Sequence, residues 1–190
     1  VAWNADTQGE RIHRVATPPE HLEDPDNRKW VYCSAAHPVQ PILVSGTTTG
    51  ELIAVDLVHG EPLGSPVSLG SPVHSIAFSP NGALLVAGDE AGQVHAWEVA
   101  SPFNLTKLPD TPRLQDAIHG LIFSHQGEQL IARETGTHGR GMVYKVNDDG
   151  LKQSSEFIHE GGIRSMAVSG SHLVSATASG ICKRTSARSR

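Results

Sequence analysis

The sequence predicts an all-β protein built from four-stranded antiparallel sheets, about four of which stand around a common axis. Three observations support this fold class. A segment of roughly 45 residues recurs along the chain. Each copy contains short apolar runs, some alternating and some continuous, which is the pattern of β-strands. Glycine (19 residues) and proline (12 residues) are frequent, as expected for a chain that turns often.

The repeat is clearest where the segments around Phe78 and Phe123 align, 45 positions apart. Val168 takes the same place after another 45 positions, and Ala36 stands 42 positions before Phe78. The residue that closes each copy also recurs, as Val55, Trp97, Tyr144 and Thr185. Four copies at this spacing indicate a repeat architecture.

Each copy predicts three strands in order, and the second copy shows them best. SIAF alternates, ALLVAG is a continuous apolar run, and QVHAW alternates again. Asn81 and Gly82 supply a hairpin turn between the first two strands, because glycine tolerates positive φ. Polar runs between copies, such as 103–108 and 151–157, predict a fourth, outer strand. Such sheets bury both faces when they stack radially, which is a β-propeller.

Residues 76–99, IAFSPNGALLVAGDEAGQVHAWEV, resemble the core phrase of the WD-repeat family. Trp97-Glu98 stands where the family has Trp-Asp, Val55-Asp56 keeps only the acid, and Tyr144-Lys145 keeps only an aromatic residue. The resemblance extends over nearly the whole chain, with degenerate repeats.

The second copy departs from the family in its polar residues. The family often ties a blade together with hydrogen bonds among a His, a Ser or Thr, an Asp and the Trp. Here Gly88 replaces the Ser and Ala91 replaces the turn Asp. A half-complete buried network is costly. We therefore expect apolar packing, not this polar set, to hold the blades.

The two ends of the chain do not complement each other. Trp3-Asn4 and the run 10–15 predict two strands at the start, whereas the last copy ends after its third strand. Rings of the family typically close with seven blades. We expect an incomplete ring, either part of a larger protein or completed by a partner chain, with a compact closed ring as the remaining alternative. The single segment 1–190 divides into blades at about 1–15 (partial), 28–70, 71–115, 116–158 and 159–190 (partial).

Composition bears on the class of partner. The formal net charge is −5, and no basic face suited to nucleic acid or a membrane surface is visible. No apolar run approaches the length of a transmembrane helix. The two cysteines, Cys33 and Cys182, form neither a disulfide framework nor a metal-binding pattern. We expect a cytoplasmic protein that binds neither nucleic acid nor membrane.

Candidate binding residues come from equivalent positions of the repeat. His74, His119 and Arg164 each begin the innermost strand of their copy, where side chains can line one rim of the central channel. One interpretation is a polar rim that contacts a partner or an anion, and the other is solvated residues that recur because the unit recurs. Turn residues between the second and third strands extend the candidate rim, namely Thr47, Asp89, Glu90 and Glu134.

The resemblance implies a non-catalytic interaction scaffold that recognises proteins or peptides, as part of a larger multidomain protein or assembly. The alternative is a metal-dependent lactonase or lyase with an active site in the channel. That chemistry needs ligands converging from several blades, and the predicted innermost strands carry mostly small or apolar residues. We expect no catalytic residue, metal or cofactor. The expected partner is another protein, the rest of the propeller or a second copy of the chain.

Overall fold

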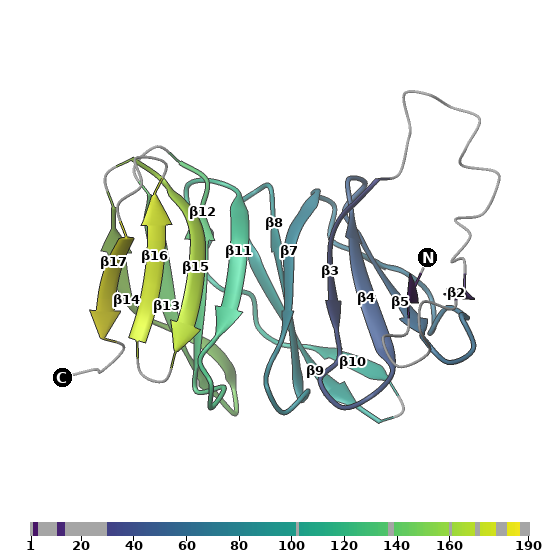
Figure 1. Ribbon diagram of the computed structural model, residues 1–190. Coiled ribbons are helices and arrows are strands. Elements are labelled where there is room, and N and C mark those ends of the chain that lie inside the picture. The colour runs from purple at the N-terminus through teal and green to yellow at the C-terminus, as the bar shows by residue number, and fades with distance from the viewer. Residues whose placement is uncertain are drawn as a thin grey trace.

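Strands make up the regular structure of the computed structural model (Figure 1), which describes residues 2–3, 11–13, 30–101, 103–136, 139–159, 161–169, 172–177 and 182–186. Within these ranges every regular element is a strand. A search of the same ranges finds no helix with the length and apolar character needed to cross a membrane. The all-β class predicted from the sequence is confirmed.

The strands form four successive sheets, called blades 1 to 4 here, and one separate pair. Blade 1 contains β3 (Val31–Ala36), β4 (Ile42–Thr47), β5 (Glu51–Asp56) and β6 (Val67–Ser68). Blade 2 contains β7 (Val73–Phe78), β8 (Leu84–Asp89), β9 (Val94–Ala100) and β10 (Asn104–Lys107). Blade 3 contains β11 (Ile118–Phe123), β12 (Gln129–Glu134), β13 (Arg140–Asn147) and β14 (Gly150–Ile158). Blade 4 contains β15 (Ile163–Ser169), β16 (His172–Thr177) and β17 (Cys182–Ser186). The pair is β1 (Ala2–Trp3) with β2 (Arg11–His13).

The strand pairing places the aligned residues of the repeat in one structural position. Each blade is antiparallel, and its strands follow each other in chain order. Phe78 lies opposite Leu85, which lies opposite Trp97. The same row in blade 3 is Phe123, Leu130 and Tyr144. Blade 1 has Ala36, Leu43 and Val55 in this row, and blade 4 has Val168, Leu173 and Thr185. The predicted alignment is therefore confirmed.

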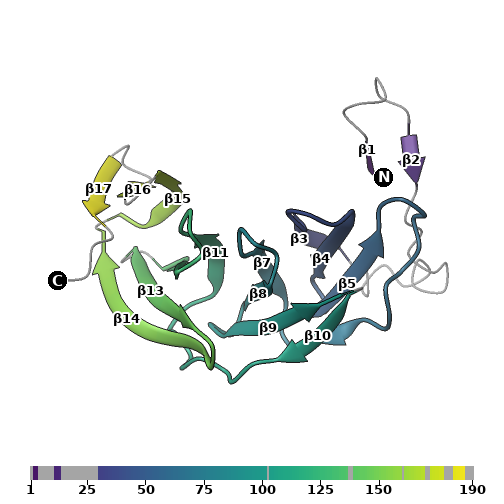
Figure 2. The same ribbon diagram turned by 90° about the horizontal axis from the view of Figure 1, so that it is seen from below.

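The blades fan out into an arc that remains open (Figure 2). The first strand of each blade lies on the inner side of the arc, and the outer strands β10 and β14 lie on its convex side. Successive inner strands are neighbours, because β3 packs beside β7, β7 beside β11 and β11 beside β15. The described blades thus form an incomplete propeller, as the sequence predicts.

Apolar side chains fill the spaces between blades. One cluster joins blades 1 and 2 and includes Val44, Leu52, Val73, Leu85 and Trp97, all buried. A second joins blades 2 and 3 through residues such as Val86, Val94, Ile118, Leu130 and Tyr144. Burying an aliphatic or aromatic side chain of this kind contributes about 1.5–3 kcal/mol. Each sheet therefore gains stability by packing against its neighbours.

Two glycines allow neighbouring blades to approach closely. A Cβ atom at Gly88 in blade 2 would overlap the side chain of Ile118 in blade 3. A Cβ atom at Gly46 in blade 1 would lie 2.6 Å from Cγ1 of Val73 in blade 2. These two equivalent strand positions must stay small because the first residue of the next inner strand packs against them.

Candidate functional site

A β-bulge recurs at the start of the inner strand in every blade. In blade 2 the pairing shifts between Val73 and Ser75, so His74 is the extra residue without a partner on the adjacent strand. The equivalent residues in blades 1, 3 and 4 are Tyr32, His119 and Arg164. A bulge redirects the side chain of its extra residue. The repeat therefore presents one redirected side chain per blade, and we call the four residues Tyr32, His74, His119 and Arg164 the bulge row.

The first three members of the bulge row touch each other in a stack. The ring centroids of Tyr32 and His74 are 5.0 Å apart with planes at 17°. Those of His74 and His119 are 4.1 Å apart with planes at 20°. Strands β3, β11 and β15 run downward in Figure 1, so their first residues lie at the upper end of the arc. The stack thus runs across three blades at this end.

Charge is distributed unevenly along the bulge row. The carboxylate Oε2 of Glu90 lies 3.9 Å from Nε2 of His74. At the other end, Arg133 donates a hydrogen bond of 3.1 Å to the carbonyl oxygen of His119. Partial burial, then His74, then Arg133 lower the pKa of His119 below its ordinary value of 6.5. A neutral imidazole is therefore favoured in the stack at neutral pH.

The structure separates the predicted rim residues into two groups. His74, His119, Arg164 and Glu90 have side chains that are partly or largely exposed at the upper end. Thr47, Asp89 and Glu134 are 0%, 2% and 2% exposed. They occupy one equivalent position, because each lies opposite the first residue of its inner strand. A partner cannot reach these three side chains on the surface.

The buried side chains accept hydrogen bonds from backbone N–H groups. Thr47 Oγ1 accepts a hydrogen bond of 3.0 Å from the Glu51 N–H. Glu134 Oε1 accepts one of 2.7 Å from the Gln115 N–H. The expectation that Thr47, Asp89 and Glu134 form part of an exposed rim is corrected accordingly. Turns at strand ends leave polar backbone groups unpaired, and these side chains satisfy them.

Blade 2 also contains a buried polar network, although the sequence predicts that apolar packing replaces the family's own polar set. Asp89 Oδ1 accepts a 2.8 Å hydrogen bond from the Gln93 N–H, and Asp89 Oδ2 lies 3.0 Å from Nε2 of His95. The ring of His95 stacks on Trp97 with centroids 6.0 Å apart. Gln93 Nε2 donates to the carbonyl of Thr111 at 2.6 Å. The blade therefore uses an Asp and a His at positions other than those compared in the sequence.

Sequence reasoning missed two residues of the site. Tyr32 follows Val31 as His74 follows Val73, so the alignment contained the signal for its place in the bulge row. Arg133 follows the apolar residues 130–132 of β12, at the position where blades 1 and 2 have Gly46 and Gly88. An arginine at a position that is glycine in two other copies of the repeat was the sequence signal that pointed to Arg133.

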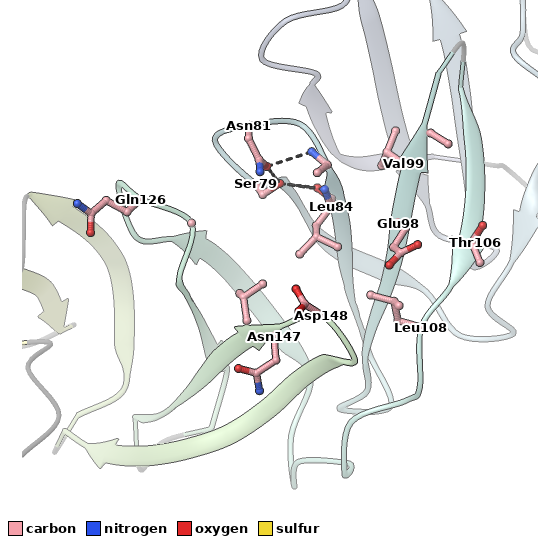
Figure 3. A pocket seen from close by; sticks show the side chains of 14 residues that line it. Ser79, Asn81, Leu84, Glu98, Val99, Thr106, Leu108, Gln126, Asn147 and Asp148 are labelled. Carbon is pink, nitrogen blue, oxygen red and sulfur yellow. Dashed lines mark hydrogen bonds between the residues drawn. The ribbon is translucent and has the colours of Figure 1, made fainter.

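A hollow lies at the end of the blades opposite the bulge row, between blades 2 and 3 (Figure 3). It encloses about 420 Å³, and Leu84 and Val99 are among its apolar lining residues. Ser79 Oγ donates to Asn81 Oδ1, which also accepts from the Ala83 N–H, and Ser79 Oγ accepts from the Leu84 N–H. Its acidic residues are Glu98 and Asp148. This hollow was not predicted from the sequence.

The described residues offer little for catalysis. Among them, no group of three or more His, Cys, Asp or Glu side chains is arranged to hold a metal ion. Burial raises the pKa of the Cys33 thiol to about 11, so it remains protonated at neutral pH. Since the thiolate is the reactive form, Cys33 is a poor nucleophile.

Comparison with known proteins agrees with the repeat. The family model for the WD40 repeat, described as "WD domain, G-beta repeat", matches residues 64–98. The serine-threonine kinase receptor-associated protein of Homo sapiens is 34% identical over 81 residues, which are 40% of this chain and 23% of that protein. The chain thus spans about a quarter of the length of this curated relative.

Two solved structures show the same fold. The computationally designed Ika8 protein superposes with a TM-score of 0.68 at 20% identity, over 82% of this chain and 45% of that chain. The structure of U3-55K superposes with a TM-score of 0.65 at 22% identity, over 77% of this chain and 45% of that chain. The chain therefore contains a WD40 repeat at residues 64–98, and its described blades have the fold of an incomplete β-propeller.

Proposed function

We propose that this chain is a non-catalytic interaction scaffold that recognises a protein or peptide at the upper end of its blades. The observation that supports the proposal is the bulge row, which brings Tyr32, His74 and His119 into one stack across three blades. Protein interaction is the general role of the WD-repeat family. The location of the partner on this rim, and the identity of the partner, are our inference.

The chemistry of the rim suits a protein partner. Tyr32 is 56% exposed, and Trp30 beside it is 58% exposed. Tyrosine, tryptophan and arginine are enriched in protein interfaces because they combine a large contact area with a polar group. The flat rings at one end and Arg164 at the other offer both apolar and charged contacts. Because the blades already hold these side chains in place, the side chains lose little conformational entropy when a partner binds.

The wider setting follows the same inference. The name of the human relative describes a protein associated with a serine-threonine kinase receptor, and we carry over only the class of partner, another protein. We propose a cytoplasmic location within a larger protein or assembly, with the remainder of the ring supplied by further chain or by a second copy. With a formal charge of −5, nucleic acid and membrane surfaces are not the proposed partners.

Affinity capture with matched variants tests the proposal. The rim variant replaces Tyr32, His74 and His119 by Ala, and the control replaces Asn147 and Asp148 by Ala at the opposite hollow (Figure 3). Proteins captured by the unmodified chain should be lost with the rim variant and kept with the control, while both variants retain the circular dichroism of the unmodified chain. Equal capture by the rim variant and the unmodified chain would contradict the proposal.

A further inference from the structure

Blades 3 and 4 enclose a basic hollow beside the bulge row. It has a volume of about 280 Å³ and lies where β11 and β15 begin. Its lining includes His119, Arg133 and Arg164 together with Gly161 and Gly162. None of the described residues that line it is an Asp or a Glu. Its described lining therefore carries two guanidinium groups and no carboxylate, while the carboxylate of Asp116 lies close to Gly136 at one side.

Blade 3 differs from blades 1 and 2 at the two positions that make room for Arg133. This residue lies opposite Gly120, whereas the same pair of positions is Cys33 with Gly46 in blade 1 and Ser75 with Gly88 in blade 2. A Cβ atom at Gly120 would lie 2.8 Å from Nε of Arg133. Glycine at position 120 is thus what gives the arginine its space. Blade 3 thus has the smaller residue on its first strand and the larger residue on its second, the reverse of blades 1 and 2. This exchange places the guanidinium of Arg133 between blades 3 and 4.

The hydrogen bonds of Arg133 hold it in place without neutralising its charge. Nη1 donates to the carbonyl oxygen of Ile163 at 2.9 Å, and Nη2 donates to that of His119 at 3.1 Å. These acceptors fix the plane of the guanidinium across the boundary between blades 3 and 4. A guanidinium has five N–H donors, so it can also bind an anion.

Neither arginine of the hollow has a carboxylate among the described residues within ion-pair distance. Arg140, on β13 of the same blade, does have one, because its Nε lies 3.7 Å from Oε2 of Glu156. Burial, followed by the charge of Arg164, lowers the pKa of Arg133. Two cations that destabilise each other in a partly buried hollow favour the binding of an anion.

We propose that this hollow binds an oxyanion on the partner peptide, a carboxylate or a phosphate, between Arg133 and Arg164. The inference rests on the proposed function, since it assumes a peptide on the rim, and it adds the chemistry of one side chain of that peptide. The fixed guanidinium plane of Arg133 suits the two oxygens of such a group. The stacked rings lie next to the hollow, so adjacent apolar residues of the same peptide would contact them.

Nuclear magnetic resonance of the labelled 190-residue chain tests the proposal. Three acetylated and amidated pentapeptides serve as probes, with glutamate, phosphoserine or serine at the centre of four alanines. The Nε–H signals of Arg133 and Arg164 are followed at low ionic strength. The glutamate or phosphoserine peptide should shift both signals, the serine peptide should not, and the stronger of the first two identifies the oxyanion. Added salt should reverse the shifts.

Matched variants identify the site. Arg133→Gln and Arg164→Gln should each weaken binding by about tenfold or more, because a charge-assisted hydrogen bond is lost. Arg140→Gln should leave affinity unchanged, since that arginine belongs to the pair with Glu156. Nuclear Overhauser cross-peaks between the rings of His74 and His119 should persist in each variant and show that it is folded. Absence of shifts up to the solubility limit, equal shifts with the serine peptide, or unchanged affinity in both hollow variants would overturn the proposal.

The outcome is separable from that of the proposed function. If the rim variant loses its captured proteins and Arg133→Gln keeps them with unchanged affinity, the scaffold function stands and the oxyanion site is overturned. If the acidic peptides bind through the two arginines while the rim variant still captures every protein, the oxyanion site stands and the aromatic rim is overturned.

Discussion

The rings of His74 and His119 stack at a centroid distance of 4.1 Å, although the two residues are 45 positions apart and lie in different blades. The contact follows from the repeat, because each histidine is the extra residue of the same β-bulge and β7 packs beside β11. Tyr32 extends the stack on one side, and Arg133 approaches His119 on the other. Blades 1 to 3 therefore each contribute one side chain to a continuous stack.

Stability should fall on acidification through the titration of His119. Its pKa in the folded chain lies below the ordinary value of 6.5, so the unfolded chain binds more protons between these two pKa values. The free energy of unfolding should decrease as the pH falls from about 6.5 to the folded pKa, and this contribution should be constant above and below that window. Urea unfolding at several pH values measures it.

A matched pair of variants isolates this effect from the other histidines. His119→Gln should flatten the pH dependence within this window, because the group that titrates is removed. His125→Gln, at an exposed turn of the same blade, serves as the control and should keep the slope of the unmodified chain. An unchanged slope in His119→Gln would contradict the assignment.

Asp89 and Glu90 should differ sharply in their contribution to stability although they are adjacent. Asp89 is 2% exposed and accepts hydrogen bonds from the Gln93 backbone and His95, whereas the side chain of Glu90 is 61% exposed. Asp89→Ala should lower the free energy of unfolding by about 1–3 kcal/mol, because it leaves buried donors without an acceptor. Glu90→Ala should change it by less than about 0.5 kcal/mol. Similar costs in chemical denaturation would show that Asp89 is not part of a buried network.

Gly88→Ala should destabilise the contact between blades 2 and 3. The added methyl group would overlap the side chain of Ile118, which is fully buried and has little room to move. Overpacking of this kind costs about 1–3 kcal/mol. Ala83→Ser adds one atom at an exposed position of the same blade and should change the free energy of unfolding by less than about 0.5 kcal/mol. An unchanged free energy of unfolding in Gly88→Ala would mean that blades 2 and 3 are not so closely packed.

Phe123→Ala should lower the free energy of unfolding by about 3–5 kcal/mol, because the ring is buried between blades 2 and 3. The sequence predicts an equal role for Phe78, but its ring is only partly buried and packs edge-on against His37 at 5.0 Å. Phe78→Ala should therefore cost less than Phe123→Ala. Thermal or urea unfolding of both variants checks the order, and a cost below about 1 kcal/mol for Phe123→Ala would place that residue outside the core.

The fold could be predicted because the residues that recur in the sequence are those that pack in the core between blades. Phe78 and Phe123, with Trp97 and Tyr144, recur at fixed spacing since each blade must bury the same row against its neighbour. The site could be predicted only in part. Position in the repeat identified His74, His119 and Arg164 as equivalent, but spacing alone did not show that the bulges bring the rings of His74 and His119 together.

The remaining features depend on contacts between blades and within turns, which a linear pattern does not contain. Asp89 is a turn residue by sequence, yet its carboxylate is directed inward to Gln93 and His95. Arg133 follows three apolar residues in β12, and the placement of its guanidinium depends on the space left by Gly120 and on the carbonyl of Ile163 in the next blade.

The most direct test of the bulge row as a surface shared by neighbouring blades is the nuclear Overhauser effect between the ring protons of His74 and His119. The centroid distance of 4.1 Å predicts cross-peaks between the two imidazoles in the labelled chain at neutral pH, and these should disappear in His119→Ala. Rings that give cross-peaks only to protons of their own blade would contradict the account.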